Sequence, residues 1–446
     1  MLRPLRKYRH VPGQWTGSYR SENSVTVATQ NGTSRGQFVH IQPQPLLGRT
    51  RRPLRTMHPS EAGPRSSVGL RARITGCGRT FAFMFALAFS SCATPPDSEH
   101  SSTWPSHVSI GFADSGICLG DSRDWNGARI NWADGELGTI NGLNVTLWGP
   151  QPSIGGTVNG IGVGLVSNGA DHLHGVFVSG YGSIAREDAI GVQCAGLATL
   201  ARNRAGIGAT LLANYAEEHQ AGVYAGGFFS GCAGTHRGIN VAGAWSAVGR
   251  DATGVTGALG WNAHGGDATG LAVGGIATTC ARDLNGVGLA VGGLGVGRSM
   301  RGLMLAGLCV RGFGFDDADA VEFERTEFAD PLSLLGGARD RDDATGSTLR
   351  GIAVAGWSVQ AGATSGIAAA LGSVSADELC GLGIAAFNDV GVLRSGCTIG
   401  AFNVAQRVEG FGMQFGLLNS IPSNPRWARW LPLVNASMGS ANADSE

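Results

Sequence analysis

A glycine-led motif recurs along this chain at nearly constant spacing, and this regularity constrains the fold more than any other feature. Between Gly206 and Gly302 the leading glycine returns every 16 residues. The leading glycines are Gly127, Gly142, Gly160, Gly175, Gly191, Gly206, Gly222, Gly238, Gly254, Gly270, Gly286 and Gly302 and, after an interruption, Gly351, Gly366, Gly381, Gly396 and Gly412. A fixed period of this kind is the signature of a repeat architecture.

Apolar residues alternate with small or polar ones after each leading glycine. In the unit that begins at Gly175, Val176 and Val178 are the apolar pair, and most units repeat the pattern with Leu, Ile or Val. Such alternation predicts a β-strand with one buried face, on which we expect these apolar side chains. A second glycine five residues on, here Gly180 before Tyr181, predicts a bend or bulge that keeps large side chains inward.

Polar sequences separate the apolar ones. Asp251–Gly254 and Asp267–Gly270 predict turns in which glycine supplies a positive φ and aspartate bonds to its own backbone. One unit therefore provides about two short strands and a turn, which bury their apolar side only when copies stack. We predict an all-β repeat solenoid with about 15–16 residues per rung (one turn of the coil) and about 15–17 rungs. The alternative is an outer-membrane β-barrel, in which each unit supplies one strand of about ten residues and a turn.

Composition and charge narrow the classes of function. Glycine accounts for 73 of 446 residues, which is about double its usual share. The formal net charge is zero, but residues 1–80 hold 14 basic side chains against Glu22 and Glu61, so residues 81–446 carry a net charge of −12. An acidic body is a poor partner for nucleic acid, and we expect no such partner.

The N-terminal part predicts export. Residues 1–70 lack periodicity and are interpreted as a disordered basic segment or a mis-annotated start. Residues 71–93 combine arginines, a short apolar run and small residues, which is the signal-peptide pattern. The run is too short to span a bilayer as a helix. Phe89-Ser90-Ser91-Cys92 is similar to a bacterial lipobox, in which the cysteine is lipidated. Cleavage after Ala93 without lipidation is the alternative.

The remaining boundaries follow the rhythm of the glycines. Residues 94–124 are predicted to be a tether, 125–310 the Gly-rich repeat domain, 311–348 an acidic insertion loop, 349–438 the continued repeats with a closing segment, and 439–446 a disordered tail. Insertions in repeat proteins often lie on the binding face. Asp316, Asp317 and Asp319 therefore mark a candidate binding loop, and a solvated loop without a ligand is the alternative.

Sequence motifs for catalysis are not found. The chain has no G-x-S-x-G elbow, no P-loop, no H-E-x-x-H and no paired C-x-x-C. Asp171-His172-Leu173-His174 has the residue types of a metal site, but no second cluster is spaced to complete one. We interpret these histidines as turn residues, together with His219, His236 and His264. We therefore expect no metal site, no cofactor and no catalytic activity.

Aspartate and cysteine each recur at one position of the repeat. Asp251, Asp267 and Asp283 occupy one repeat position and predict a ladder of carboxylates. Such a ladder is able to hold Ca²⁺, but the dense acidic pattern of calcium-binding repeats is missing, so Asx-turns are favoured. Cys232 and Cys280 also share a repeat position but lie three rungs apart, too far for a disulfide. The repeat cysteines are predicted to be buried free thiols, with one or two bridges as the alternative in an oxidising compartment.

Two units and the C-terminal end resemble a bacterial surface-repeat family. Its motif is G-Φ-Q-Φ-(A)-G-L-Φ-N, where Φ is apolar, and it is matched by Gly191–Leu197 and Gly412–Asn419. The segment Trp430–Ala436 looks like the closing L-P-Φ-Φ-N segment of the same family. The resemblance implies an exported protein of the cell surface or outer membrane and carries over no catalytic residue. Most units lack the Gln and Asn of the motif.

We therefore expect an exported, surface-associated repeat protein with a structural or binding role. Its expected partners are a lipid anchor in the membrane and a surface protein or glycan. Besides the β-barrel, the other alternative is a solenoid enzyme that acts on polysaccharide. That class needs carboxylates or arginines gathered on one face, and only the 311–348 insertion supplies them.

Overall fold

The computed structural model describes residues 16–21, 24–29, 107–112, 114–134, 137–150, 155–314 and 346–439. The chain divides into two units, Met1–Val68 and Gly69–Glu446. In the first unit, β1 (Thr16–Ser21) and β2 (Ser24–Thr29) form an antiparallel hairpin. This hairpin is the described part of the segment predicted to be disordered or mis-annotated.

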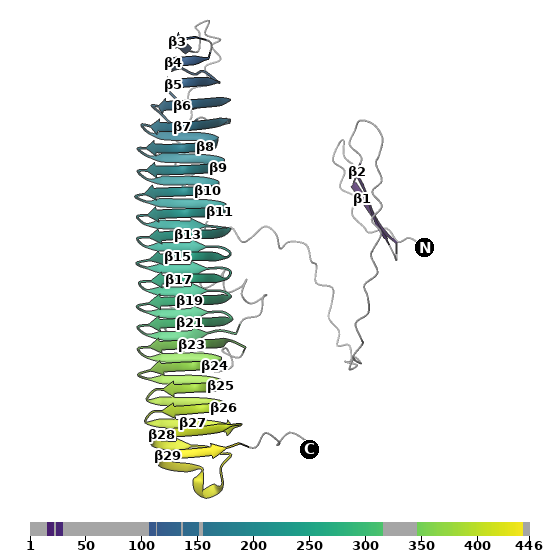
Figure 1. The fold of residues 1–446 in the computed structure, drawn as a ribbon, viewed down its shortest axis with the longest axis vertical. Coiled ribbons are helices and arrows are strands. Elements are labelled where there is room, and N and C mark those ends of the chain that lie inside the picture. The colour runs from purple at the N-terminus through teal and green to yellow at the C-terminus, as the bar shows by residue number, and fades with distance from the viewer. Residues whose placement is uncertain are drawn as a thin grey trace, which may run out of the picture. The chain divides into compact units, whose positions relative to one another are not determined.

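The second unit consists almost entirely of short strands stacked along one axis (Figure 1). The first strands are β3 (His107–Gly111), β4 (Ser115–Gly120), β5 (Trp125–Asn131), β6 (Thr139–Thr146), β7 (Thr157–Gly164), β8 (Ser167–Ser179), β9 (Gly182–Ala195), β10 (Ala198–Thr210) and β11 (Ala213–Gly226). The middle strands are β12 (Phe229–Cys232), β13 (Thr235–Ala242), β14 (Trp245–Val248), β15 (Ala252–Ala258), β16 (Trp261–His264), β17 (Ala268–Gly274), β18 (Ala277–Cys280), β19 (Asp283–Ala290), β20 (Gly293–Val296), β21 (Ser299–Ala306) and β22 (Cys309–Gly312). The last strands are β23 (Thr348–Ala355), β24 (Ser358–Ala370), β25 (Ser373–Ile384), β26 (Phe387–Ile399), β27 (Phe402–Val408), β28 (Phe411–Ser420) and β29 (Trp430–Met438).

From β4 to β28 the strands pair in parallel with the equivalent strand of the next rung, as β13 pairs with β15 and β12 with β14. The predicted solenoid is confirmed, with about 16 turns. The β-barrel alternative is wrong, because neighbouring strands of a membrane barrel run antiparallel.

One rung has four parts, and the rung that holds β12 and β13 shows them clearly. The short strand β12 is followed by a corner at residues 233–234, the longer strand β13 and a bend at residues 243–244. In β8 to β11 and β24 to β26 the short and the long part belong to one continuous strand. The stacked short parts form one wall of the solenoid, which we call the short sheet, and the stacked long parts form the opposite wall, the long sheet.

The leading glycines stand in one column along the long sheet, where each pairs with the glycine of the next rung from Gly116 to Gly412. From Gly116 to Gly396 they have positive φ, between 117° and 142°. An added Cβ at Gly238 would overlap the carbonyl oxygen of Gly222. No other residue type fits both constraints, and the column explains why the motif begins with glycine.

The predicted turns lie elsewhere than expected. Gly254 has the expected positive φ, but it lies inside β15, which already begins at Ala252. The turn therefore precedes Ala252, at the corner that includes Asp251. The bend predicted at the second glycine is confirmed, since Gly180 and Tyr181 connect β8 to β9.

The strand faces are opposite to the prediction. Ile161, Val176 and Ile207 are 50%, 41% and 51% exposed, whereas Phe177 and Asn240, two residues after their glycines, are buried. Tyr181 also points outward and is about half exposed. The alternation was correct, but a period of two does not say which face is buried. The space between the two walls is filled mainly by the small or polar residues that alternate with the outward apolar ones.

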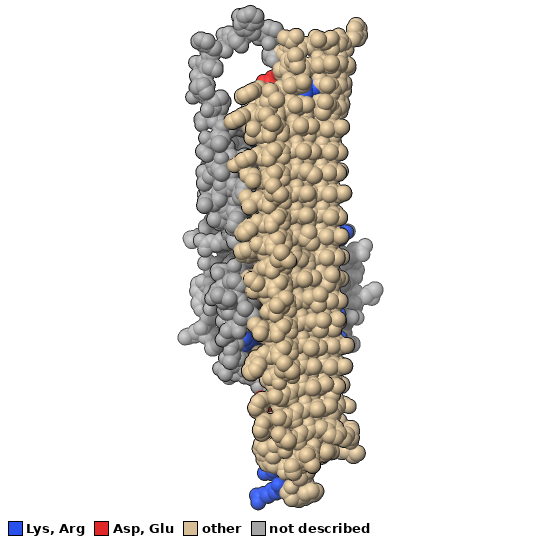
Figure 2. Space-filling model, turned by 90° about the vertical axis from the view of Figure 1, so that its left-hand side faces the viewer, with Lys and Arg blue, Asp and Glu red and all other residues tan. Residues whose placement is uncertain are grey.

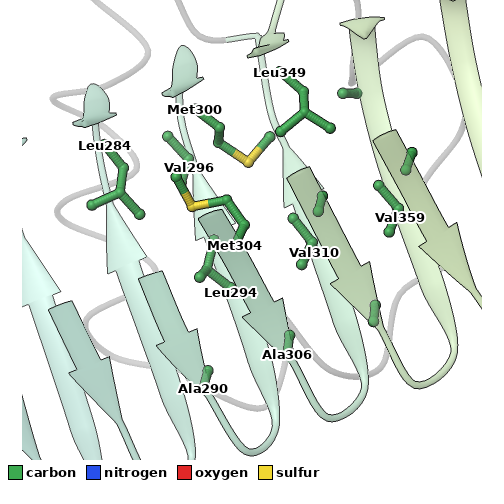
Figure 3. Packing of buried hydrophobic residues seen from close by; sticks show 14 of the residues in the cluster. Leu284, Ala290, Leu294, Val296, Met300, Met304, Ala306, Val310, Leu349 and Val359 are labelled. Carbon is green, nitrogen blue, oxygen red and sulfur yellow. The ribbon is translucent and has the colours of Figure 1, made fainter. Parts of the chain in front are cut away.

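The interior holds a narrow apolar core around β17 to β25 (Figure 3). Met300 and Leu349 come from the long sheet, and Leu294 and Val310 from the short sheet. Close packing allows a large residue only where a neighbouring rung leaves space. A Cβ at Gly288 would stand 2.6 Å from Leu294 Cδ1 and 3.0 Å from Met304 Sδ, so Gly288 makes room for both side chains.

The core is polar in the middle of the solenoid. Arg204 is buried, donates to Gln193 Oε1 at 2.9 Å and to Asn214 Oδ1, and lies over the Tyr224 ring at 4.6 Å. Burial lowers the pKa of Arg204 to about 10. These contacts satisfy the guanidinium in part without a carboxylate.

Antiparallel strands close both ends of the solenoid. At the N-terminal end β3 pairs with β4, and at the C-terminal end β29 pairs with β28 after the short 3-10 helix η2 (Arg426–Ala428). The predicted tether is therefore too long, because β3 and β4 lie inside residues 94–124. The segment Trp430–Ala436 lies in β29, where Asn435 is buried. The insertion leaves the register intact, since Gly302 pairs directly with Gly351.

Candidate binding surface

The outer face of the long sheet carries two columns of apolar side chains, one and three residues after each leading glycine. Register pairing aligns them, as Ile207 pairs with Val223 and Val223 with Ile239. The first column runs from Ile117 to Met413 and the second from Leu119 to Phe415, and neither contains a charged residue. We call them the apolar columns.

The bends add a ridge of larger side chains at the edge that follows the columns. Leu211, Leu259 and Leu371 are 77%, 80% and 80% exposed, which is more than any residue of the apolar columns. Further exposed members are Leu165, Tyr181, Phe228, Ile276, Val291, Leu308 and Trp357. We call this set the bend ridge. At its N-terminal end the rings of Trp132 and Trp148 stack with centroids 6.1 Å apart.

The side of the solenoid that includes the bend ridge is almost free of charge (Figure 2). The bends lie at the left-hand edge of Figure 1, and Figure 2 looks onto that edge. Charged side chains are visible there only near the ends and at the margins. Monomeric soluble proteins rarely expose continuous apolar patches beyond about 300–600 Å². The exposed apolar side chains of the bend ridge, on a side with few charges, therefore make this edge a candidate interaction site.

Charged residues gather at the opposite edge, where the corners lie. Arg202 donates to Glu187 at 3.0 Å and to Glu218 at 2.9 Å, each on a neighbouring rung. Arg394 bridges in the same way to Glu378 at 2.8 Å. Exposed pairs of this kind contribute little to stability, but they keep this edge hydrated.

The predicted aspartate ladder is present at the corners. Asp251 Oδ1 accepts the backbone N–H of Asp267 at 3.0 Å, and Asp267 Oδ1 accepts that of Asp283 at 3.3 Å. Asp283 is paired with Arg298 at 2.9 Å. The carboxylates bond to the backbone of the next rung rather than to their own, and this geometry accounts for the repeat position without an ion.

The histidines divide into two groups. His172 contacts Asp188 at 3.1 Å, and His219 contacts Thr235 Oγ1 at 2.8 Å. All five histidines interpreted as turn residues lie in strands, so that interpretation is wrong: His172 and His174 lie in β8, His219 in β11, His236 in β13 and His264 in β16. His236 and His264 are buried inside the solenoid. Burial lowers the pKa of both buried imidazoles to about 4. His172 and His219 are three residues before their leading glycines and His236 is two before its own, so they lie on opposite faces of the strand. The sequence did not say which of these faces is the inner one.

A buried polar cluster near the N-terminal end has the residue types of a binding site. Asp134 accepts from Arg129 Nη1 at 3.2 Å, from Asn131 and Asn144 at 3.0 and 3.1 Å, and from Thr146 at 2.8 Å. The carboxylate is thus fully occupied by its own neighbours. Within the described ranges no three His, Cys, Asp or Glu side chains group as metal ligands.

Cysteines of the described rungs are free thiols. Cys232 and Cys280 are buried as predicted, and burial raises their pKa values to about 11 and about 12. Both thiols are therefore protonated and unreactive at neutral pH. Cys380 is exposed, contrary to the prediction.

Some predicted positions lie outside the described residues. These are Cys92 with the signal segment 71–93, and Asp316, Asp317 and Asp319 of the insertion. In the parts of the chain that the structure describes, no helix is long and apolar enough to cross a membrane.

Comparisons with known proteins found no matching family model, no matching curated protein and no matching solved structure. The resemblance of the repeat units and of Trp430–Ala436 to a surface-repeat family therefore remains a prediction.

Proposed function

We propose that this chain is an exported, surface-associated repeat protein with a structural or binding role and no catalytic activity. The observation that carries the proposal is the bend ridge, an uncharged apolar edge opposite the charged corners. A solenoid holds every bend in register, so weak contacts add along its length. An apolar partner at the cell surface is the expected ligand of the ridge.

The chemistry of the corners supports a role without catalysis. The carboxylates of Asp251 and Asp267 accept backbone N–H groups, and Glu187 and Glu218 are paired with Arg202. The space lined by Thr256, Ala272 and neighbouring residues between rungs is too small for a water molecule. Polysaccharide hydrolysis needs two carboxylates placed across a bound sugar, and these groups are engaged elsewhere.

Export is tested on the full-length protein in its host. Membrane fractionation is combined with intact-mass measurement of the mature N-terminus, for the native chain and for Cys92→Ser. We expect a diacylglyceryl group on Cys92 and release of Cys92→Ser from the membrane fraction. A protein that retains residues 71–93 and remains inside the cell contradicts the proposal.

The ridge is tested with Leu211→Lys and Leu259→Lys combined in one chain. Both side chains are almost fully exposed, so the substitutions are expected to leave folding intact. Because Cys92→Ser is expected to leave the membrane, all proteins are compared in that background, as purified protein added to washed host cells. The ridge variant should be retained on the cells less than the Cys92→Ser parent. Glu217→Lys, an exposed corner position, is the matched control and should keep the retention of the parent. Equal retention of all three proteins rules out the ridge.

A further inference from the structure

The apolar columns differ from the bend ridge in shape. The ridge is a convex edge, whereas the columns lie on a sheet face that repeats once per rung. Along the axis the side chains are about 4.8 Å apart, and across it the two columns are about 6.6 Å apart. Leu, Ile and Val on such a face are half-exposed at Ile161, Ile207 and Ile352. The interior is already filled, so these side chains face outward for another reason.

We infer that a second copy of this chain covers the apolar columns, so that the protein is a two-fold symmetric dimer packed through its long sheets. A flat sheet face pairs best with another sheet, because two sheets pack face to face about 10 Å apart with interdigitating side chains. A second copy has the same rung spacing, so each rung meets an equivalent rung along the whole contact. Isologous contacts of this kind are the commonest in soluble oligomers.

The size of the face fits a stable dimer. About 16 turns at about 4.8 Å per strand give a length of about 75 Å. Two columns with their side chains are about 12 Å wide, so each copy would bury about 900 Å². Stable interfaces bury about 800 Å² per partner. The columns alone therefore provide the area that self-association requires.

The charge pattern also favours a second copy over a lipid surface. The columns have no charged residue, and a rim of exposed Arg237, Arg301 and Arg350 borders them two residues before the first column. An apolar centre with a polar rim is the usual anatomy of a protein interface. Binding to anionic lipid depends on clusters of basic residues, whereas residues 81–446 carry a net charge of −12.

The test is the oligomeric state of the mature-length chain, measured by sedimentation velocity at micromolar concentration. Ile207→Lys with Ile239→Lys places two ammonium groups in the centre of the first column, two rungs apart. Burying two unpaired ammonium groups is costly. We therefore expect a dimeric parent and a monomeric variant, with the dimer dissociation constant raised at least 100-fold. Both positions point outward, so the circular dichroism spectrum should remain that of the parent. The Tm of the variant should equal that of the parent at dilutions where the parent dimer has dissociated. Glu217→Lys, at the corner, should remain a dimer.

Native cysteines give a second readout that does not require a variant. Cys194 lies in the second column and Cys397 in the first. Cys380 is exposed on the rim, two residues before the first column, and the rim of an interface stays accessible to solvent. Alkylation followed by peptide mapping should show protection of Cys194 and Cys397 that increases with protein concentration, and no such change at Cys380.

Three results overturn the inference. They are a parent chain that stays monomeric over the concentration range, a dimer that survives both lysines, and protection of Cys380 equal to that of Cys194. Sedimentation of the parent, but not of Ile207→Lys with Ile239→Lys, on phosphatidylcholine vesicles would assign the face to lipid instead. None of these results depends on export, so the inference fails or holds separately from the proposed function.

Discussion

The inner and outer faces of the long strands carry different kinds of side chain, and the difference shows which face packs inside the solenoid and which one is available to a partner. Inward positions hold Gly288, Asn240 or Thr256, with a larger residue such as Met304 only where a glycine on a neighbouring rung makes space. Outward positions hold Val, Ile and Leu. The size of the inward side chains is limited by the short distance between the two walls. The size of the outward side chains is limited only by the partner that binds there. Apolar residues on the unlimited side therefore indicate a partner rather than a core.

Acid should weaken the inner side most. His236 and His264 are buried with pKa values of about 4, below the ordinary 6.5. Because the unfolded chain binds more protons between pH 6.5 and 4, stability falls as pH decreases through that window. The expected loss is about 3 kcal/mol per histidine at the acid limit. Denaturant titrations across this range measure it.

Matched variants show whether the pH dependence of stability comes from the inner side of the strands. His236→Leu with His264→Leu should flatten the profile between pH 6.5 and 4, whereas Ile239→Ala, on the outer side of β13, removes no titratable group and should leave the shape of the profile unchanged. A parent chain whose stability is constant from pH 7 to 4 would show that the two imidazoles are not buried in the neutral form.

The glycine column should be the least tolerant line of positions. Gly238→Ala adds a Cβ against the carbonyl oxygen of Gly222 at a φ of 121°. We expect a loss of about 3–4 kcal/mol from backbone strain and overlap together, measured by urea unfolding. Ile239→Ala, the next residue but on the outer side, should change the stability of the monomer by less than about 1 kcal/mol. Equal losses would mean that the column is not constrained.

The pairing of small and large inner residues gives an intermediate effect. Gly288→Ala should cost about 1–3 kcal/mol because it overpacks Leu294 and Met304. A Cβ at Gly288 would also stand 2.8 Å from Leu284 Cδ2, so Met304→Ala removes one of three close contacts. It should restore part of the loss, so the double variant is more stable than the two single losses predict. Strict additivity in thermal unfolding would show that the two positions do not touch.

Substitutions at the corners should change the free energy of unfolding least. Arg202→Ala removes two exposed ion pairs, with Glu187 and Glu218. Such pairs contribute about 0–1 kcal/mol each and are screened by salt. The expected loss is therefore below about 1 kcal/mol at low ionic strength and smaller in high salt. A loss comparable to that of Gly238→Ala would contradict the division between the corners and the inner side.

The glycine period was enough to predict a repeat of β-strands, with the solenoid preferred, but the barrel was excluded only by the parallel pairing of successive rungs. It was not enough to orient the strands. Val176 and Val178 alternate with Phe177, which is apolar as well, so the pattern does not rank the two faces. The burial of His236 was equally hidden, because His236 lies on the same face of β13 as Asn240 and the sequence did not show that this face is the inner one. Orientation is decided by the positive φ of the glycines and by the space between the walls.

The most direct test of this account compares two neighbouring positions of β13. Ile239→Cys and Asn240→Cys are alkylated in the folded protein at low concentration, and each rate is read by peptide mapping beside that of the native Cys380. The account predicts that a thiol at position 239 reacts at a rate similar to Cys380, whereas a thiol at position 240 is protected until the chain unfolds. Protection at 239 with ready reaction at 240 would place the apolar residues inside and contradict the central claim.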